Sequence, residues 1–267
     1  MKFQAFEQIM PFKDIIFTMS ICTVRMAAIL SIAPFISQNF VQGTARNAVV
    51  LALTVILVPM VLPSLPPDGL TTVQLLKIVV KEAILGVFLG FIAAMPFWLA
   101  QSIGFMVDNQ RGSSMASIFD PMAGEETSPL GSMMTKVATV LFFTTGAFLT
   151  FLDIIYDTYR IWPVFSFFPQ YNAGFPGFFL SIVDRLSSLT LLIAAPMIFV
   201  MFLTDLGLGM MNRFAPQLNV FFLSMPIKSA LGIFIFIIYF GLVLNFMEED
   251  FLHTNDLLIF LRSMIMP

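Results

Sequence analysis

Side chains that could carry out catalysis are few and widely separated in this sequence. His253 is the single histidine and Cys22 the single cysteine, so neither an intramolecular disulfide nor a cysteine-based metal cluster is expected. No HExxH, G-x-S-x-G or Walker A pattern occurs, and these motifs would place a metal, a nucleophile or a phosphate. His253 stands beside acidic residues and is expected to be solvated. We therefore predict no enzymatic activity, no catalytic residues, no metal and no cofactor.

Charged residues within apolar stretches are more informative. A charged side chain at the centre of a membrane helix costs about 2.5–3.5 kcal/mol on insertion scales, so each is expected to have an ionic partner or a watery surface. The charges of this kind are Arg25, Lys81, Glu82, Asp184, Arg185 and Lys228. Lys81, Glu82 and Lys228 could snorkel from helix ends, or they could pair between helices or subunits. Coupling to protons or ions is less favoured, because the charges do not gather on one helix face.

A polar connector at residues 104–136 is the most unusual segment of the chain. It contains the turn signals Asp120-Pro121 and Ser128-Pro129, and apolar residues lead into a polar stretch at 108–111. Non-helical backbone at membrane depth is tolerated only inside protein or along a watery cavity. The connector is therefore predicted to line a passage, with an exposed surface loop as the alternative.

The elements that must position these residues are predicted to be membrane helices. Hydrophobic residues make up 58% of the chain and charged residues 11%, against about 25% charged residues in soluble domains. A helix needs about 20 apolar residues to cross the hydrocarbon. Stretches that meet or approach this length are 15–35, 47–65, 83–107, 137–152, 186–204 and 229–247. Pro96 and Pro196 should kink two of them, and 257–266 is too short to span.

The expected fold is an all-α membrane protein with about six long hydrophobic helices, several of them kinked and arranged as helical hairpins. We predict a single membrane-embedded domain over 1–267 that ends in a polar tail at 248–267. Gly86 and Gly90 form a GxxxG pattern, which lets a second helix backbone approach closely, although the pattern also occurs by chance. The net charge of −3 offers no basic surface for nucleic acid.

Several motifs resemble a known family. They read MPFW at 95–98, DNQRG at 108–112, TSPLG at 127–131, RFAPQLNVF at 213–221 and MPIKS at 225–229. In this order they are similar to the FliR/SpaR/YscT family of type III secretion export-apparatus proteins, also called SctT. The resemblance extends from about 46–47 to 228–229, and the first two motifs look like the injectisome branch more than the flagellar one.

The resemblance implies a structural subunit of an export gate in the bacterial inner membrane. Members join SctR-like and SctS-like subunits, work with an SctU-like switch protein and an SctV-like gate protein, and pass unfolded secreted proteins. The connector would contribute to a plug, with Phe105, Asp108, Gln110, Arg111, Asp120 and Pro121 as its working residues. The candidates for subunit packing are Gly86, Gly90, Lys81, Glu82, Arg213, Pro216, Asn219 and Lys228.

Two other classes of function compete with this interpretation. A secondary transporter of a small solute would place kinked helices and buried charges around a midplane site. That class predicts inverted repeats, which the sequence does not display, and a pocket of convergent charges. An intramembrane enzyme would need a catalytic dyad or a metal cluster, and neither is visible in the sequence.

Overall fold

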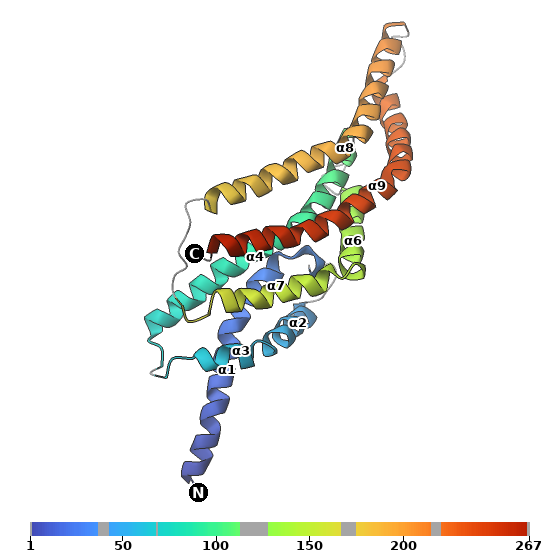
Figure 1. Cartoon of the computed structure of the whole chain (residues 1–267). Coiled ribbons are helices and arrows are strands. Elements are labelled where there is room, and N and C mark those ends of the chain that lie inside the picture. Colours follow the sequence, from blue (N-terminus) through green and yellow to red (C-terminus); the bar gives the residue numbers. More distant parts are fainter. Residues whose placement is uncertain are drawn as a thin grey trace. The chain divides into compact units, whose positions relative to one another are not determined.

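The computed structural model describes residues 2–36, 43–67, 69–112, 128–166, 175–214 and 220–265. Within these ranges, side chains are described except at 2–11, 175–176, 221 and 252–265. All regular elements of this part of the chain are helical (Figure 1), which confirms the predicted all-α class. They are α1 (Lys2–Ile32), η1 (Pro34–Ile36), α2 (Gly43–Val55), α3 (Val58–Val61), η2 (Leu62–Ser64), α4 (Thr72–Gln110), α6 (Pro129–Thr144), α7 (Ala147–Ile161), α8 (Phe175–Phe214) and α9 (Val220–Ile265).

The described helices include four to six that are long and apolar enough to cross a membrane. Single helices supply four candidate spans: Phe12–Ile32, Thr72–Gln110, Gly177–Phe214 and Phe222–Phe251. Two more arise if each bent pair counts as one span, namely α2 with Val58–Ser64, bent by 41°, and α6 with α7, bent by 75°. These numbers confirm the prediction of about six hydrophobic helices.

Helix boundaries differ from the predicted stretches in two ways. The helices α4, α8 and α9 continue well beyond the apolar windows, because polar residues that flank a window can still extend a helix. The predicted stretch 137–152 is instead divided between α6 and α7 at Gly146, whose φ of 79° lies in the left-handed region that favours glycine. Pro96 and Pro196 lie inside continuous helices.

The chain divides into two compact units. The first unit comprises Met1–Ala94, Gly146–Phe175 and His253–Pro267, and the second comprises Met95–Thr145 and Pro176–Leu252. Helices α4 and α9 contribute residues to both units. The single membrane-embedded domain over 1–267 therefore stays a prediction, and the predicted polar tail begins as a continuation of α9.

In the first unit, α1 packs one side against its neighbours. The buried residues of α1 recur at helical spacing and are Thr18, Ile21, Cys22, Arg25, Met26, Ile29 and Leu30. A Cβ atom added to Gly86 of α4 would lie 2.5 Å from Ala28 Cβ and 2.6 Å from the Arg25 carbonyl oxygen. One turn further along, a Cβ on Gly90 would lie 2.8 Å from the Ile29 carbonyl oxygen. The GxxxG pattern thus brings α4 against α1 of the same chain.

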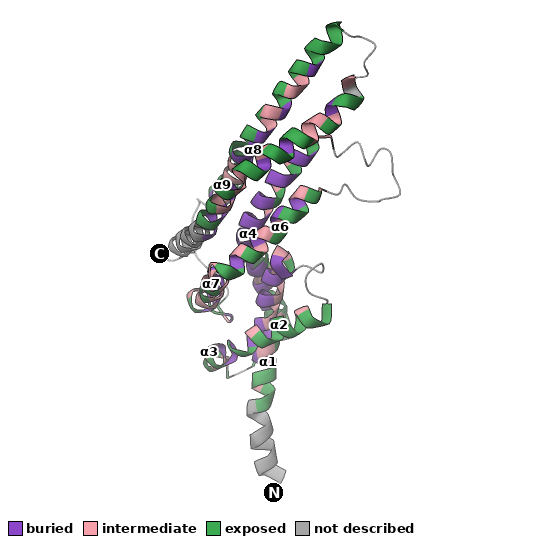
Figure 2. Ribbon diagram, turned by 90° about the vertical axis from the view of Figure 1, so that its right-hand side faces the viewer, coloured by how far each residue is buried: buried purple, intermediate pink, exposed green. Residues whose placement is uncertain are grey.

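The second unit contains a buried aromatic cluster. Phe97 of α4 lies with its ring centroid 5.2 Å from that of Phe142 in α6 and 5.3 Å from that of Phe251 in α9. Figures 1 and 2 show α8 and α9 side by side, and Figure 1 shows both bending along their length. Where these two helices meet, Gly232 faces Met201, whose sulfur would lie 3.1 Å from an added Cβ.

Burial is uneven among the long helices. In the most apolar window of each candidate span, 67% of residues are buried for α4, but only 28% for α8 and 22% for α9. Figure 2 shows the exposed residues following α8 and α9. Helices that are apolar on most of their circumference need lipid or other protein around them. The hairpin of α8 and α9 therefore presents most of its apolar surface to something outside this chain.

Candidate functional site

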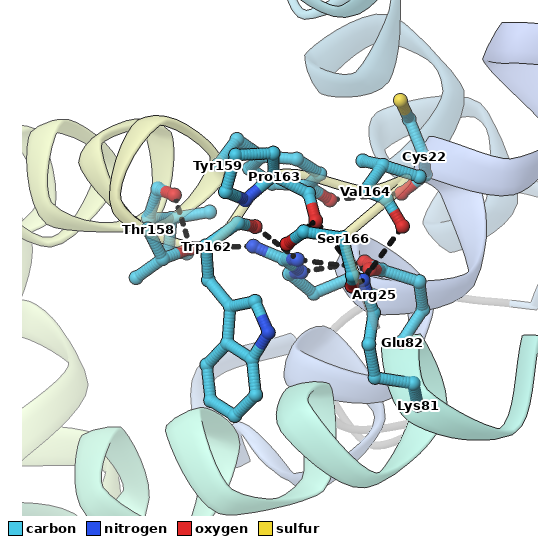
Figure 3. A network of polar contacts seen from close by, with 11 residues as sticks. Cys22, Arg25, Lys81, Glu82, Thr158, Tyr159, Trp162, Pro163, Val164 and Ser166 are labelled. Carbon is cyan, nitrogen blue, oxygen red and sulfur yellow. Dashed lines mark hydrogen bonds and ion pairs between the residues drawn. The ribbon is translucent and has the colours of Figure 1, made fainter. Parts of the chain in front are cut away.

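A buried polar network joins α1, α4 and α7 in the first unit (Figure 3). Arg25 of α1 and Glu82 of α4 are both fully buried. The Arg25 Nε donates to Glu82 Oε2 over 2.6 Å, and its Nη2 donates to Glu82 Oε1 over 2.9 Å. This two-point arrangement is the strong form of an arginine–carboxylate contact. It connects residues 57 positions apart in the sequence.

The remaining Arg25 contacts go to α7 and its end. Arg25 Nη2 also donates to the Trp162 carbonyl oxygen over 3.0 Å, and Nη1 donates to Thr158 Oγ1 over 3.2 Å. The guanidinium carbon lies 4.1 Å from the centroid of the Tyr159 ring, within the range of a cation–π contact. The Tyr159 hydroxyl in turn donates to the Cys22 carbonyl oxygen over 2.9 Å. Each guanidinium nitrogen therefore has a partner, as burial of a charge requires.

Lys81 completes the network. Its Nζ donates to the carbonyl oxygens of Pro163, Val164 and Ser166 over 3.0, 2.6 and 2.9 Å. It also lies 2.9 Å from Glu82 Oε1. The Glu82 carboxylate thus faces two cations, Arg25 and Lys81. The excess positive charge is stabilised by backbone carbonyl oxygens at and beyond the C-terminal end of α7, where the helix dipole is negative. The network ties three helices together and fixes the segment after α7.

A second polar cluster, which we call the Asp108 clasp, consists of Asp108, Arg111, Ser128 and the Leu130 backbone N–H in the second unit. The Ser128 hydroxyl donates to Asp108 Oδ2 over 2.6 Å, and the Leu130 N–H donates to the same oxygen over 2.8 Å. Ser128 also caps α6, because its Oγ accepts from the Gly131 N–H over 2.9 Å. Arg111 contacts Asp108 Oδ1 as an ion pair, without the alignment of a hydrogen bond. The clasp joins the end of α4 to the start of α6.

Two glycines bring α4 and α6 into backbone contact beside the clasp. A Cβ added to Gly104 would lie 2.5 Å from the Gly131 nitrogen and 2.6 Å from the Gly131 Cα. In the reverse direction, a Cβ on Gly131 would lie 3.0 Å from the Gln101 carbonyl oxygen. Any larger side chain at Gly104 would push the helices apart. Gly131 belongs to the TSPLG motif and Gly104 is the first residue of the connector, but their sequence spacing does not predict that they meet.

The predicted plug residues separate into three groups. Asp108 is 1% exposed and Arg111 is 16% exposed at its side chain, and the two meet in the clasp. Phe105 is 41% exposed and Gln110 is half-buried, and neither belongs to the clasp. Two further candidates, Asp120 and Pro121, lie outside the described residues. A role in a plug stays a prediction for all six.

Five of the six described candidates for subunit packing make contacts within this chain. Gly86, Gly90, Lys81 and Glu82 face the interior of the first unit, as set out above. Lys228 of α9 pairs with Asp205 of α8 over 3.1 Å, while Arg213 is exposed at the end of α8. The remaining candidates, Pro216 and Asn219, lie outside the described residues. Packing against another subunit stays a prediction at these positions.

Sequence reasoning missed several partners that the structure supplies. Asp205 and Asp250 pair with Lys228 and Arg185 between α8 and α9, and Thr158 and Tyr159 contact Arg25. Ser128 had a usable signal, because a serine followed directly by proline is typical of a helix N-cap with proline at the first helical position. The other partners have no local signal. Within the described residues, no group of His, Cys, Asp and Glu side chains is placed to hold a metal ion.

Comparison with known proteins identifies the family. Residues 16–254 match the family model described as bacterial export proteins, family 1. The chain is 39% identical to "Yop proteins translocation protein T" of Yersinia pestis, over 83% of this chain and 85% of the relative. It is 30% identical to "Surface presentation of antigens protein SpaR" of Salmonella typhimurium, over 82% and 81%. It is 26% identical to "Flagellar biosynthetic protein FliR" of Bacillus subtilis, over 87% and 90%. With nearly the whole described chain matched and the predicted FliR/SpaR/YscT resemblance confirmed, this multi-pass inner-membrane protein belongs to the bacterial export proteins of family 1.

Proposed function

We propose that this chain is a structural subunit of the export gate of a type III secretion system. With SctR-like and SctS-like subunits it forms the channel that unfolded effector and needle proteins use to cross the bacterial inner membrane. An SctU-like switch protein and an SctV-like gate protein are its further partners. The names of its relatives support this role, since they include a Yop translocation protein and "Secretion system apparatus protein SsaT", to which the chain is 32% identical. Identity to the flagellar relatives is lower, at 26% and 28%, which favours the injectisome branch.

The observation that carries the proposal is the uncovered apolar surface of α8 and α9. Large exposed side chains on these helices include Leu192, Phe199, Met210, Phe234, Ile237 and Ile238, each at least 59% exposed. An apolar surface of this extent needs either lipid or neighbouring helices. In a gate subunit, helices of other subunits cover part of it. In this proposal the chain contributes to the assembly of the gate and carries out no chemistry. The Arg25–Glu82 network and the Asp108 clasp agree with this role, because both hold helices of the chain together.

The buried charges do not favour a solute transporter. Such a protein needs charges that converge on a site open to its substrate. Here Arg25 and Glu82 are fully buried and bound to each other, and Lys81 is occupied by carbonyl oxygens. Because these groups already have partners within the chain, they offer no free charge to a solute.

The test is to purify the tagged full-length chain gently from its native membrane and to weigh the particle. A large assembly with two other small hydrophobic subunits is the expected result, and deletion of the chain should abolish secretion. An unrelated tagged inner-membrane protein, purified in parallel, controls for non-specific association. A stable monomer or homodimer without these companions would refute the proposal.

A further inference from the structure

The Asp108 clasp lies where the chain leaves α4 and where it enters α6. Helix α4 ends at Gln110, and Ser128 is the N-cap of α6. Asp108 accepts two hydrogen bonds from the α6 side, one from the Ser128 hydroxyl and one from the Leu130 N–H. The carboxylate of Asp108 therefore holds the last turn of α4 against the start of α6, on either side of residues 113–127.

The chemistry of the clasp is specific to its residue types. The first N–H groups of a helix have no partner within the helix, and Asp108 satisfies that of Leu130. A carboxylate is also favoured at the positive N-terminal end of the α6 dipole. The Ser128 hydroxyl donates to Asp108 and accepts from Gly131 at the same time. Alanine at 128 would remove both bonds, whereas threonine would keep a hydroxyl that can make both.

The glycines add a second contact to this junction. Gly104 and Asp108 are four residues apart on α4, so they lie on one helix face. Gly131 follows Ser128 by three residues on α6, where it meets Gly104 at backbone distance. The C-terminal end of α4 and the N-terminal end of α6 thus meet at two successive points. The glycine backbones are in contact at the first, and Asp108, which is 1% exposed, forms hydrogen bonds at the second.

We propose that Asp108 is a positioning residue, which sets where the connector begins and ends and does not itself contact the exported chain. The inference rests on the proposed function, and it changes the role that the family resemblance implied for Asp108. Its side chain is occupied by the start of α6. Phe105, one turn earlier on α4, is 41% exposed and takes no part in the clasp.

The test replaces the chromosomal copy with variants of the full chain. Two quantities are measured: the amount of the chain in the purified particle, and the substrate secreted per assembled particle. A charge-assisted hydrogen bond shifts an equilibrium roughly tenfold or more. Asp108→Ala removes the oxygen that accepts from Ser128 and Leu130, and Ser128→Ala removes one of its donors, so each should lower secretion per particle on the order of tenfold. The double variant should be no worse than the more severe single variant, because both changes disrupt one clasp.

Two serine variants serve as controls. Ser128→Thr keeps the hydroxyl and should secrete at nearly the wild-type rate. Ser132→Ala makes the same chemical change at an exposed position one turn further along α6 and should have no effect. A purely structural fault would lower the number of particles and leave secretion per particle unchanged.

Three outcomes would overturn the inference. Secretion lost in Asp108→Ala but normal in Ser128→Ala would mean that Asp108 does not act through the N-cap of α6, which contradicts the positioning role. Normal secretion in both variants would remove any role for the clasp. Failure of both variants to enter the particle would leave only a role in folding. The proposed function fails separately, when deletion of the whole chain leaves secretion intact.

Discussion

The buried Arg25–Glu82 pair supports the sharpest prediction. Glu82→Gln removes the single carboxylate of the network and leaves Arg25 and Lys81 as two buried or nearly buried cations. Breaking a buried ion pair by removing one partner costs about 3–5 kcal/mol. This loss shifts the equilibrium between the folded form of this region and its locally opened form by roughly two to three and a half orders of magnitude. It is also a large share of the free energy of unfolding of a typical protein, which is about 5–15 kcal/mol.

Cys22 provides the assay for this change. It is fully buried beside the network and is the single cysteine of the chain. A maleimide reagent should therefore label it only when this part of the chain opens, at a rate that follows the population of the open form. For Glu82→Gln in the detergent-purified particle, labelling should accelerate by about two to three and a half orders of magnitude.

Matched variants separate the charge effect from loss of packing. Arg160→Ala breaks the Arg160–Asp157 pair on α7, whose side chains are 70% and 36% exposed, and exposed pairs contribute about 0–1 kcal/mol. A double change of Arg25→Met and Glu82→Leu replaces the pair with apolar groups and should recover much of the loss. If Glu82→Gln labels no faster than Arg160→Ala, the reasoning about the buried pair is wrong.

Three other changes test separate parts of the fold. Gly86→Ala places a Cβ against Ala28 and the Arg25 carbonyl and should destabilise the first unit by about 1–3 kcal/mol; equal thermal stability to wild type would contradict the close approach. Gly207→Ala meets no atom within 4 Å, so it should leave thermal stability unchanged or raise it by up to about 1 kcal/mol. Lys81→Met removes three hydrogen bonds to carbonyl oxygens and should speed amide hydrogen exchange in the segment 163–166, where unchanged exchange would show that Lys81 does not hold the segment.

Much of the architecture follows from the sequence for a simple physical reason. In lipid, backbone polar groups must be satisfied within the segment, so a long apolar stretch becomes a helix. This is why α1, α4, α8 and α9 could be predicted from hydrophobicity alone. Their ends could not, because helices extend past the apolar window wherever flanking residues allow it. Gly146 could not be recognised as a sharp bend, since a glycine within an apolar run also occurs inside helices.

The family was also readable from the sequence, because its motifs are long and occur in order. The motifs named Asp108 and Arg111 as important, but they did not state what those residues contact. Ser128 was included in a motif without a role, although Ser-Pro at a helix start is a capping signal. The role of Asp108 depends on α6 returning to the end of α4, and no local pattern determines that return.

The sequence alone determined that this protein is a helical membrane protein of an export family, and that its buried charges need partners. Only the tertiary structure decided which partners those are. Arg25 meets Glu82 across 57 residues and Tyr159 across a greater separation, while Lys81 binds backbone carbonyls that carry no side-chain signal. In lipid the apolar faces of helices are nearly equivalent, so hydrophobic periodicity does not specify which helices pair. Close packing at Gly86, Gly90, Gly104 and Gly131 selects those pairs and brings the charges together.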